Sequence, residues 1–150
     1  MVVLGNEHYE RRAFGTRFVQ CPGIYKHFKG KYYATLGVSI GMPKDYYISL
    51  LSRGETLESI GTVKICGTEP EGYLVTIFKD KDEDGLLVHI VDNTPEVYNI
   101  PTRLVIYKAL YDTNSPTYGR PIESFLSLTD RDKYSKKEYP QHYRMELIKY

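Results

Sequence analysis

The sequence predicts a mainly β protein that folds as one domain and forms a small barrel. Short segments of alternating apolar and polar residues recur along the chain, and turn-forming Gly and Pro residues separate them. The chain has 15 Tyr and 5 Phe but no Trp, and aromatic residues favour β-strands. Its 150 residues fit one domain, or one domain with a large insertion, and can bury a core without disulfides.

The first two strands are predicted on either side of a tight turn at Gly30. Segment 24–28 alternates, which places Tyr25 and His27 on one face of the first strand. Beyond the turn, alternation predicts an apolar stripe that faces the interior. We expect the same interior to receive side chains of a later strand, so that it contains Tyr32, Leu36, Val38, Leu104, Ile106 and Leu110.

A helix is predicted over Pro43–Arg53, because Pro43 suits a first turn and Gly54 a helix end. Strands are expected over 62–66, 73–78 and 86–91, the last two joined as a hairpin. The second half repeats the pattern, with strands over 103–111 and 118–121, one turn of helix over 121–126, a polar loop over 133–140, and a closing strand over 142–148.

The acidic turn between the two hairpin strands resembles the start of a calcium loop. It reads Asp80-x-Asp82-x-Asp84-Gly85, but Val91 stands where such a loop has its bidentate Glu. The turn is therefore predicted to be a solvated hairpin tip. No metal site is predicted from the histidines either, because they are scattered along the chain, at His8, His27, His89 and His142. We expect no cofactor.

Net charge and hydropathy argue against two classes of protein, general nucleic-acid binders and membrane-spanning proteins. The net charge of +1 gives no global attraction to nucleic acid, and apolar runs such as 85–91 are too short to cross a bilayer. The N-terminal residues lack the pattern of a signal peptide. Cys21 and Cys66 form no CxxC pair, so we expect free thiols and a cytoplasmic protein.

Three blocks of sequence resemble a small bacterial and phage family known as domain of unknown function 1653. The first block runs from Gly23 to Val38 and contains the run Tyr25-Lys26-His27-Phe28-Lys29-Gly30. The second is Leu104–Tyr111, and the third contains Arg120-Pro121 followed by Phe125. A weaker echo occurs at 143–147.

This resemblance implies an SH3-like β-barrel core over residues 23–38 and 103–148. The intervening segment 39–102 departs from the family pattern and is expected to be an insertion with its own helix and strands. The resemblance supplies no established function.

Six residues are candidates for a ligand site, because their polar-tipped side chains lie on strand faces opposite the apolar stripes or in the turn beyond. Aromatic faces stack on flat ligands, and an Arg binds phosphate or carboxylate through two hydrogen bonds. The alternative is structural, with Tyr hydroxyls bonded to the backbone and the Arg bonded to a turn carbonyl. The candidates are Tyr25, His27, Tyr33, Tyr107, Tyr111 and Arg120.

These observations favour a non-enzymatic binding module that sequesters a small, anionic, nucleotide-like ligand. A protein-interaction module, such as a phage-encoded inhibitor, is the alternative. Single-stranded nucleic-acid binding is a third and weaker hypothesis, based on Lys26, Lys29 and Lys31 among tyrosines. The sequence contains no nucleophile elbow, P-loop or dinucleotide fingerprint, so no catalytic residue is predicted.

Overall fold

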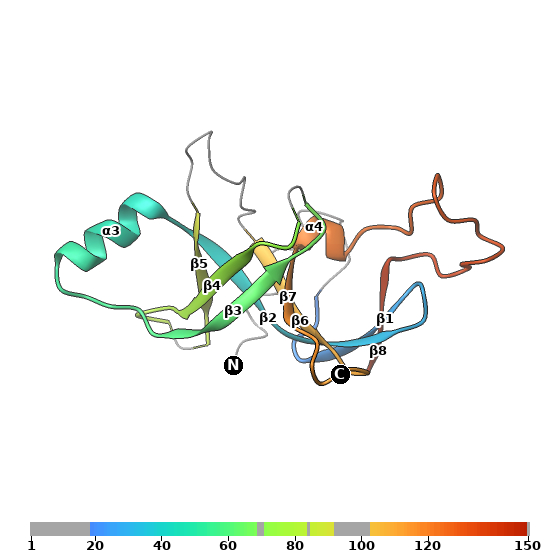
Figure 1. Ribbon diagram of the computed structural model, residues 1–150, viewed down its shortest axis with the longest axis horizontal. Coiled ribbons are helices and arrows are strands. Elements are labelled where there is room, and N and C mark those ends of the chain that lie inside the picture. The colour runs from blue at the N-terminus through green and yellow to red at the C-terminus, as the bar shows by residue number, and fades with distance from the viewer. Residues whose placement is uncertain (1–18, 69–70, 84, 92–102, 150) are drawn as a thin grey trace.

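The computed structural model describes residues 19–68, 71–83, 85–91 and 103–149 (Figure 1). Two helices in these ranges are α3 (Lys44–Ser52) and α4 (Ile122–Phe125). The strands are β1 (Gly23–His27), β2 (Tyr32–Pro43), β3 (Ser59–Ile65), β4 (Leu74–Lys79), β5 (Leu87–Val91), β6 (Arg103–Ala109), β7 (Thr117–Pro121) and β8 (Met145–Lys149). The predicted class, a mainly β small barrel with an inserted helix and extra strands, is confirmed.

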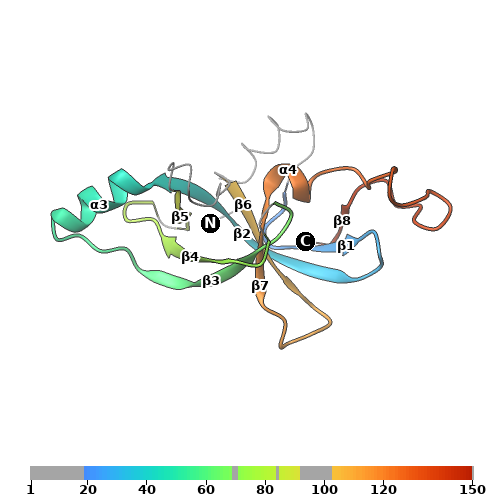
Figure 2. The same cartoon turned by 45° about the horizontal axis from the view of Figure 1, so that its top comes forward.

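Six strands close the barrel. The sheet order is β5-β4-β3-β7-β6-β2-β1-β8, and β5 also pairs with β2, which closes a ring of β2, β6, β7, β3, β4 and β5. Two contacts in this ring are parallel, β2 with β5 and β3 with β7. Strands β1 and β8 continue the sheet beyond β2 and lie in the half of the molecule opposite α3 (Figures 1 and 2).

The segment predicted as an insertion contributes to the barrel itself. Strands β3, β4 and β5 all lie within residues 39–102, and β2 runs across the boundary from Tyr32 to Pro43. The insertion and the family-like blocks therefore share one sheet.

The barrel strands separate two cores. The inner core lies within the ring and contains Val63, Ile65, Val75, Ile77, Leu104 and Ile106. The outer core lies on the other face of β2 and β6, beneath α4, β1 and β8, and includes Tyr25, Val38, Val105, Tyr107, Phe125 and Met145. Burial of both faces of β6 explains its nearly continuous apolar sequence.

The predicted single interior was wrong for four of its six members. Val38, Leu104 and Ile106 are buried, but Tyr32, Leu36 and Leu110 are 42%, 50% and 51% exposed. Leu36 is exposed because it lies in a β-bulge. The pairing of β2 with β6 steps from Thr35 to Gly37 and leaves Leu36 without a partner residue on β6. One extra residue reverses the alternation, so Val38 faces the outer core and not the inner one.

Local sequence features predicted the turns and the long helix correctly. Gly30 has a positive φ of 102°, which Gly adopts without steric cost, and it joins β1 to β2 as a hairpin. Helix α3 begins after Pro43 and ends before Arg53, with Leu50 buried against Met42 and Val88.

The acidic turn connects β4 to β5, which form an antiparallel hairpin. The Asp80 carboxylate accepts hydrogen bonds from the backbone N–H groups of Asp82 (3.1 Å) and Glu83 (2.8 Å), an arrangement typical of a local turn. Asp84 and His8 lie outside the described residues. Within the described ranges, no group of three or more His, Cys, Asp or Glu side chains could hold a metal ion.

Neither Cys21 nor Cys66 forms a disulfide in the described part of the chain. Among the described residues, no helix has the length and hydropathy needed to cross a membrane.

Candidate ligand-binding site

Five of the six predicted site residues meet on the outer face of the barrel. They come from β1 (His27), β2 (Tyr33), β6 (Tyr107), the turn after β6 (Tyr111) and β7 (Arg120). Tyr33 is central, with its ring centroid 6.3 Å from that of His27, 5.5 Å from Tyr107 and 5.7 Å from Tyr111. The Tyr33 and Tyr111 hydroxyls are hydrogen bonded at 3.1 Å.

Tyr25 does not join this group. It is fully buried in the outer core, where its ring packs edge-on against Phe125 at 5.1 Å. Its hydroxyl accepts a hydrogen bond from the Gln20 backbone N–H at 2.9 Å. The structural alternative therefore describes Tyr25 correctly, and this residue has no exposed surface for a ligand.

The Arg120 guanidinium is held by neutral side chains. Its Nε donates to the Tyr107 hydroxyl (3.2 Å) and its Nη1 to Ser124 Oγ (2.8 Å), so these partners are side chains and not the turn carbonyl of the structural alternative. Gly67 lies against it, because a Cβ there would be 2.6 Å from Nη1. Gly67 also has φ +80°, a backbone conformation that favours glycine.

The structure adds residues that the sequence did not indicate. Arg144, the residue before β8, has a buried Nε with no hydrogen-bond partner among the described residues, and its guanidinium lies 5.8 Å from the Phe28 ring centroid. Cys66 Sγ lies 3.0 Å from the Tyr107 hydroxyl. We call the group the Arg–Tyr cluster and define it as His27, Tyr33, Cys66, Tyr107, Tyr111, Arg120 and Arg144.

The pKa of His27 reflects the positive charges around it. Burial, together with the nearby positive charges of Arg144, Arg120 and Lys29, lowers its pKa to about 4. Its Nδ1 accepts a hydrogen bond from the Lys29 backbone N–H at 3.1 Å. The imidazole is therefore neutral at pH 7 with its proton on Nε2, which makes Nε2 a hydrogen-bond donor.

Arg120 and Arg144 give the cluster its positive charge. Burial raises the pKa of Tyr33 and of Tyr107, so both phenols are neutral at pH 7. Among the described residues, no carboxylate forms an ion pair with Arg120 or Arg144. Burial and the nearby Arg120 lower the pKa of Arg144. Glu71 exerts a weaker attraction on Arg120, and its carboxylate already accepts the Gly67 N–H at 2.9 Å.

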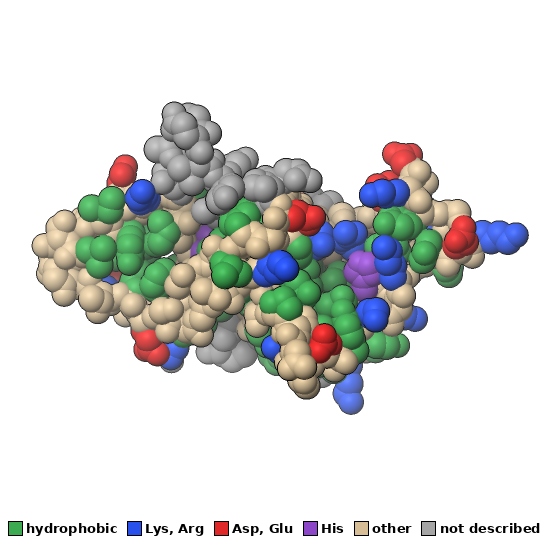
Figure 3. All heavy atoms as spheres, in the orientation of Figure 1, with side chains coloured by type: hydrophobic (Ala, Val, Ile, Leu, Met, Phe, Trp, Pro, Cys, Tyr) green, Lys and Arg blue, Asp and Glu red, His purple; other side chains and the backbone are tan. Residues whose placement is uncertain are grey.

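In the space-filling view, Lys and Arg side chains surround a histidine in the half of the molecule that carries β1 and β8 (Figure 3).

No protein-family model matches the chain, no curated protein matches its sequence and no solved structure matches its fold. The resemblance to domain of unknown function 1653 therefore stays a prediction.

Proposed function

We propose that the protein is a non-enzymatic binding module that holds a small anionic ligand with a flat ring, such as a nucleotide derivative, at the Arg–Tyr cluster. One observation carries the proposal. Two partly buried guanidinium groups, Arg120 and Arg144, act on each other and on His27, and neither has a carboxylate partner among the described residues.

A bound anion would complete the hydrogen bonding of this cluster. Leaving a buried donor unsatisfied costs about 1–3 kcal/mol, and more for a charged group. Among the described residues, Arg144 Nε is a buried donor without an acceptor. A phosphate or carboxylate oxygen accepts from guanidinium groups in charge-assisted hydrogen bonds. The Nε2–H of His27 adds a neutral donor beside them.

The aromatic side chains favour a ligand that also carries a ring. Tyr111 is 51% exposed and is joined to the half-buried Tyr33 through their hydroxyls. Lys31 Nζ lies 4.3 Å from the Tyr111 ring centroid, so this ring is already placed beside a positive charge. Stacking of a base on an aromatic side chain contributes about 1–3 kcal/mol.

Binding without chemistry fits the state of His27. A general base needs a free lone pair, but the His27 Nδ1 lone pair accepts the Lys29 N–H and Nε2 carries the proton. The two phenols have raised pKa values, which makes them poor bases as well. A module of this kind would act by sequestering its ligand.

Calorimetry with three related compounds tests the proposal. AMP combines a ring with an anion, ribose 5-phosphate has the anion alone and adenosine the ring alone. We expect AMP to bind most tightly and Arg144→Gln to weaken it by about tenfold to a hundredfold, the loss of a charge-assisted hydrogen bond. Arg53→Gln is the matched control, because Arg53 is exposed and pairs with Glu55 at the end of α3.

A second pair of variants tests how much the Tyr111 ring contributes to AMP binding. Tyr111→Ala should weaken AMP but not ribose 5-phosphate, whereas Tyr46→Ala should change neither. Tyr46 has nearly the same exposure, 49%, but lies on α3.

Equal effects of Arg144→Gln and Arg53→Gln on AMP affinity would contradict the proposal.

A protein partner is the second candidate at the same surface. The exposed side chains of Tyr32 and Leu110 belong to the chain neighbours of Tyr33 and Tyr111, and the Leu110 N–H donates to the Tyr32 carbonyl at 3.0 Å. If neither AMP nor ribose 5-phosphate bound the wild-type protein, this apolar edge would favour a partner protein over a small ligand.

A further inference from the structure

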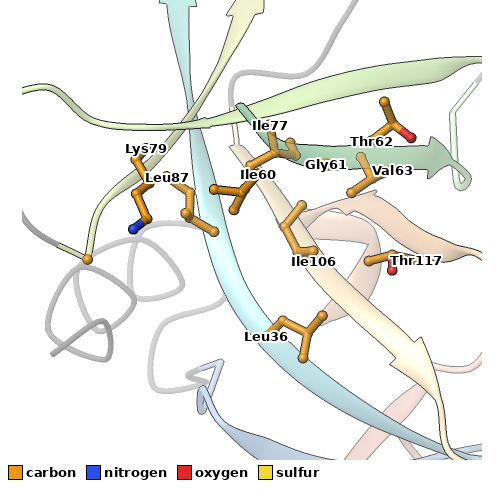
Figure 4. A pocket seen from close by; sticks show the side chains of 11 residues that line it. Leu36, Ile60, Gly61, Thr62, Val63, Ile77, Lys79, Leu87, Ile106 and Thr117 are labelled. Carbon is orange, nitrogen blue, oxygen red and sulfur yellow. The ribbon is translucent and has the colours of Figure 1, made fainter. Parts of the chain in front are cut away.

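Two β-bulges place apolar side chains at the same opening of the barrel. In β2 the bulge leaves Leu36 unpaired, and in β3 a second register shift between Ser59 and Gly61 leaves Ile60 unpaired. These side chains are 50% and 47% exposed, yet both line one cavity (Figure 4). Bulges at barrel rims commonly redirect a side chain beside a functional site.

The cavity reaches the inner core from this opening. Its volume is about 450 Å³. Buried Val63, Ile77 and Ile106 of the inner core line it, together with the half-buried Leu87. Small-molecule sites have volumes of roughly 300–1,000 Å³ and occur in the mouths of β-barrels. The cavity is thus large enough for a small ligand, and a ligand there would contact the inner core directly.

Among the described residues that line this apolar cavity, Lys79 is the charged one. It lies beside Leu87 in Figure 4, and the other described lining residues are apolar or neutral. Its Nζ is 3.9 Å from Glu58 Oε2, and both side chains are more than half exposed, so this pair holds the ammonium group weakly. Lys79 can therefore bind a negative group that reaches the rim.

We propose that the barrel mouth is a second binding site, separate from the Arg–Tyr cluster, and that it takes an amphipathic small molecule with an apolar body and one anionic group. The apolar body enters among Ile60, Ile77 and Ile106, and the anionic group pairs with Lys79 at the rim. A linear aliphatic carboxylate has this chemistry.

Methyl NMR can locate such a ligand, because isoleucine residues lie both in the cavity and away from it. Decanoate is titrated into protein with labelled isoleucine methyl groups, below the concentration at which it forms micelles. We expect the Ile60, Ile77 and Ile106 signals to shift together and saturate. Ile122 of the outer core, near the Arg–Tyr cluster, and Ile48 on α3 should not move.

Matched variants then separate the apolar and charged contacts. Ile60→Ala should weaken decanoate about fivefold, while Ile48→Ala, with 48% exposure on α3, should leave it unchanged. Lys79→Met should lower decanoate affinity about threefold and leave that of decanol unchanged. Both changes are at exposed positions, so the fold should be retained, and Leu36→Ala repeats the rim test on the opposite bulge.

Three results would overturn the proposal. These are no saturable shift of the cavity methyl groups, shifts of equal size at Ile122, or equal effects of Ile60→Ala and Ile48→Ala. The second result would place decanoate at the Arg–Tyr cluster, and the third would indicate non-specific association. Because AMP binding is measured separately, failure at the barrel mouth does not affect the first site.

Discussion

Tyr107→Phe removes one hydroxyl from the centre of the Arg–Tyr cluster and leaves the ring in place. The ring packs against Tyr33 (5.5 Å), Tyr118 (5.6 Å) and Phe125 (5.4 Å), and Phe can keep these contacts. The hydroxyl accepts the Arg120 Nε–H at 3.2 Å and lies 3.0 Å from Cys66 Sγ. The substitution therefore tests the polar contacts alone.

The expected cost follows from what Arg120 loses. Its Nε would lose this acceptor in a partly buried position, and a hydrogen bond to a charged group contributes about 1.5–3 kcal/mol. Tyr111→Phe is the matched control, because it also removes one hydroxyl bond, but at a side chain that is 51% exposed. Water can replace that bond, so we expect less than about 0.5 kcal/mol.

Urea denaturation measures both variants. Equal m-values with a lower midpoint for Tyr107→Phe would show a loss of stability without a change in the surface exposed on unfolding. If Tyr107→Phe cost no more than Tyr111→Phe, the hydroxyl would not hold Arg120, and the described geometry of the cluster would be wrong.

Three further predictions test the fold and its charges. Leu104→Ala should cost about 2–5 kcal/mol in urea denaturation, but Leu36→Ala under about 1, because only Leu104 is fully buried. Below pH 6.5 the unfolded chain takes up the His27 proton before the folded one does, so stability should fall by about 1–2 kcal/mol as pH drops towards 4; His27→Gln should remove this part of the slope. Calcium should leave the melting temperature unchanged, since the Asp80 carboxylate accepts turn N–H groups; a saturable rise lost in Asp82→Asn would contradict this.

Local features of the sequence were sufficient for the hairpin of β1 and β2 and for α3. Gly30 and the Pro43–Gly54 pair act through backbone geometry, which depends on a few neighbouring residues. Closure of the barrel depends instead on the parallel pairings of β2 with β5 and β3 with β7. These join strands far apart in sequence, and alternation within a strand does not identify its neighbour.

The bulge at Leu36 shows where alternation fails. The pattern Tyr32, Ala34, Leu36, Val38 is regular in sequence, but one unpaired residue moves Val38 to the opposite face of the sheet. A bulge has no reliable sequence mark at this position, so the predicted interior mixed residues of the inner core, the outer core and the surface.

The candidate site was predicted in part because strand faces place polar-tipped aromatics together. His27, Tyr33, Tyr107, Tyr111 and Arg120 meet as expected, whereas Tyr25 is covered by α4 through Phe125. Arg144 was missed, because an Arg before an edge strand usually reaches solvent. Its burial depends on the position of β8 beside β1, which is a long-range contact.

The pKa of His27, measured by NMR with and without AMP, tests the central proposal most directly, because this ring lies beside both guanidinium groups. In the free protein we expect a pKa of about 4. The AMP phosphate keeps at least one negative charge in this range, and it should raise the His27 pKa by about one pH unit or more, while adenosine at the same concentration should not. A His27 pKa that AMP leaves unchanged at saturating concentration would contradict anion binding at the Arg–Tyr cluster.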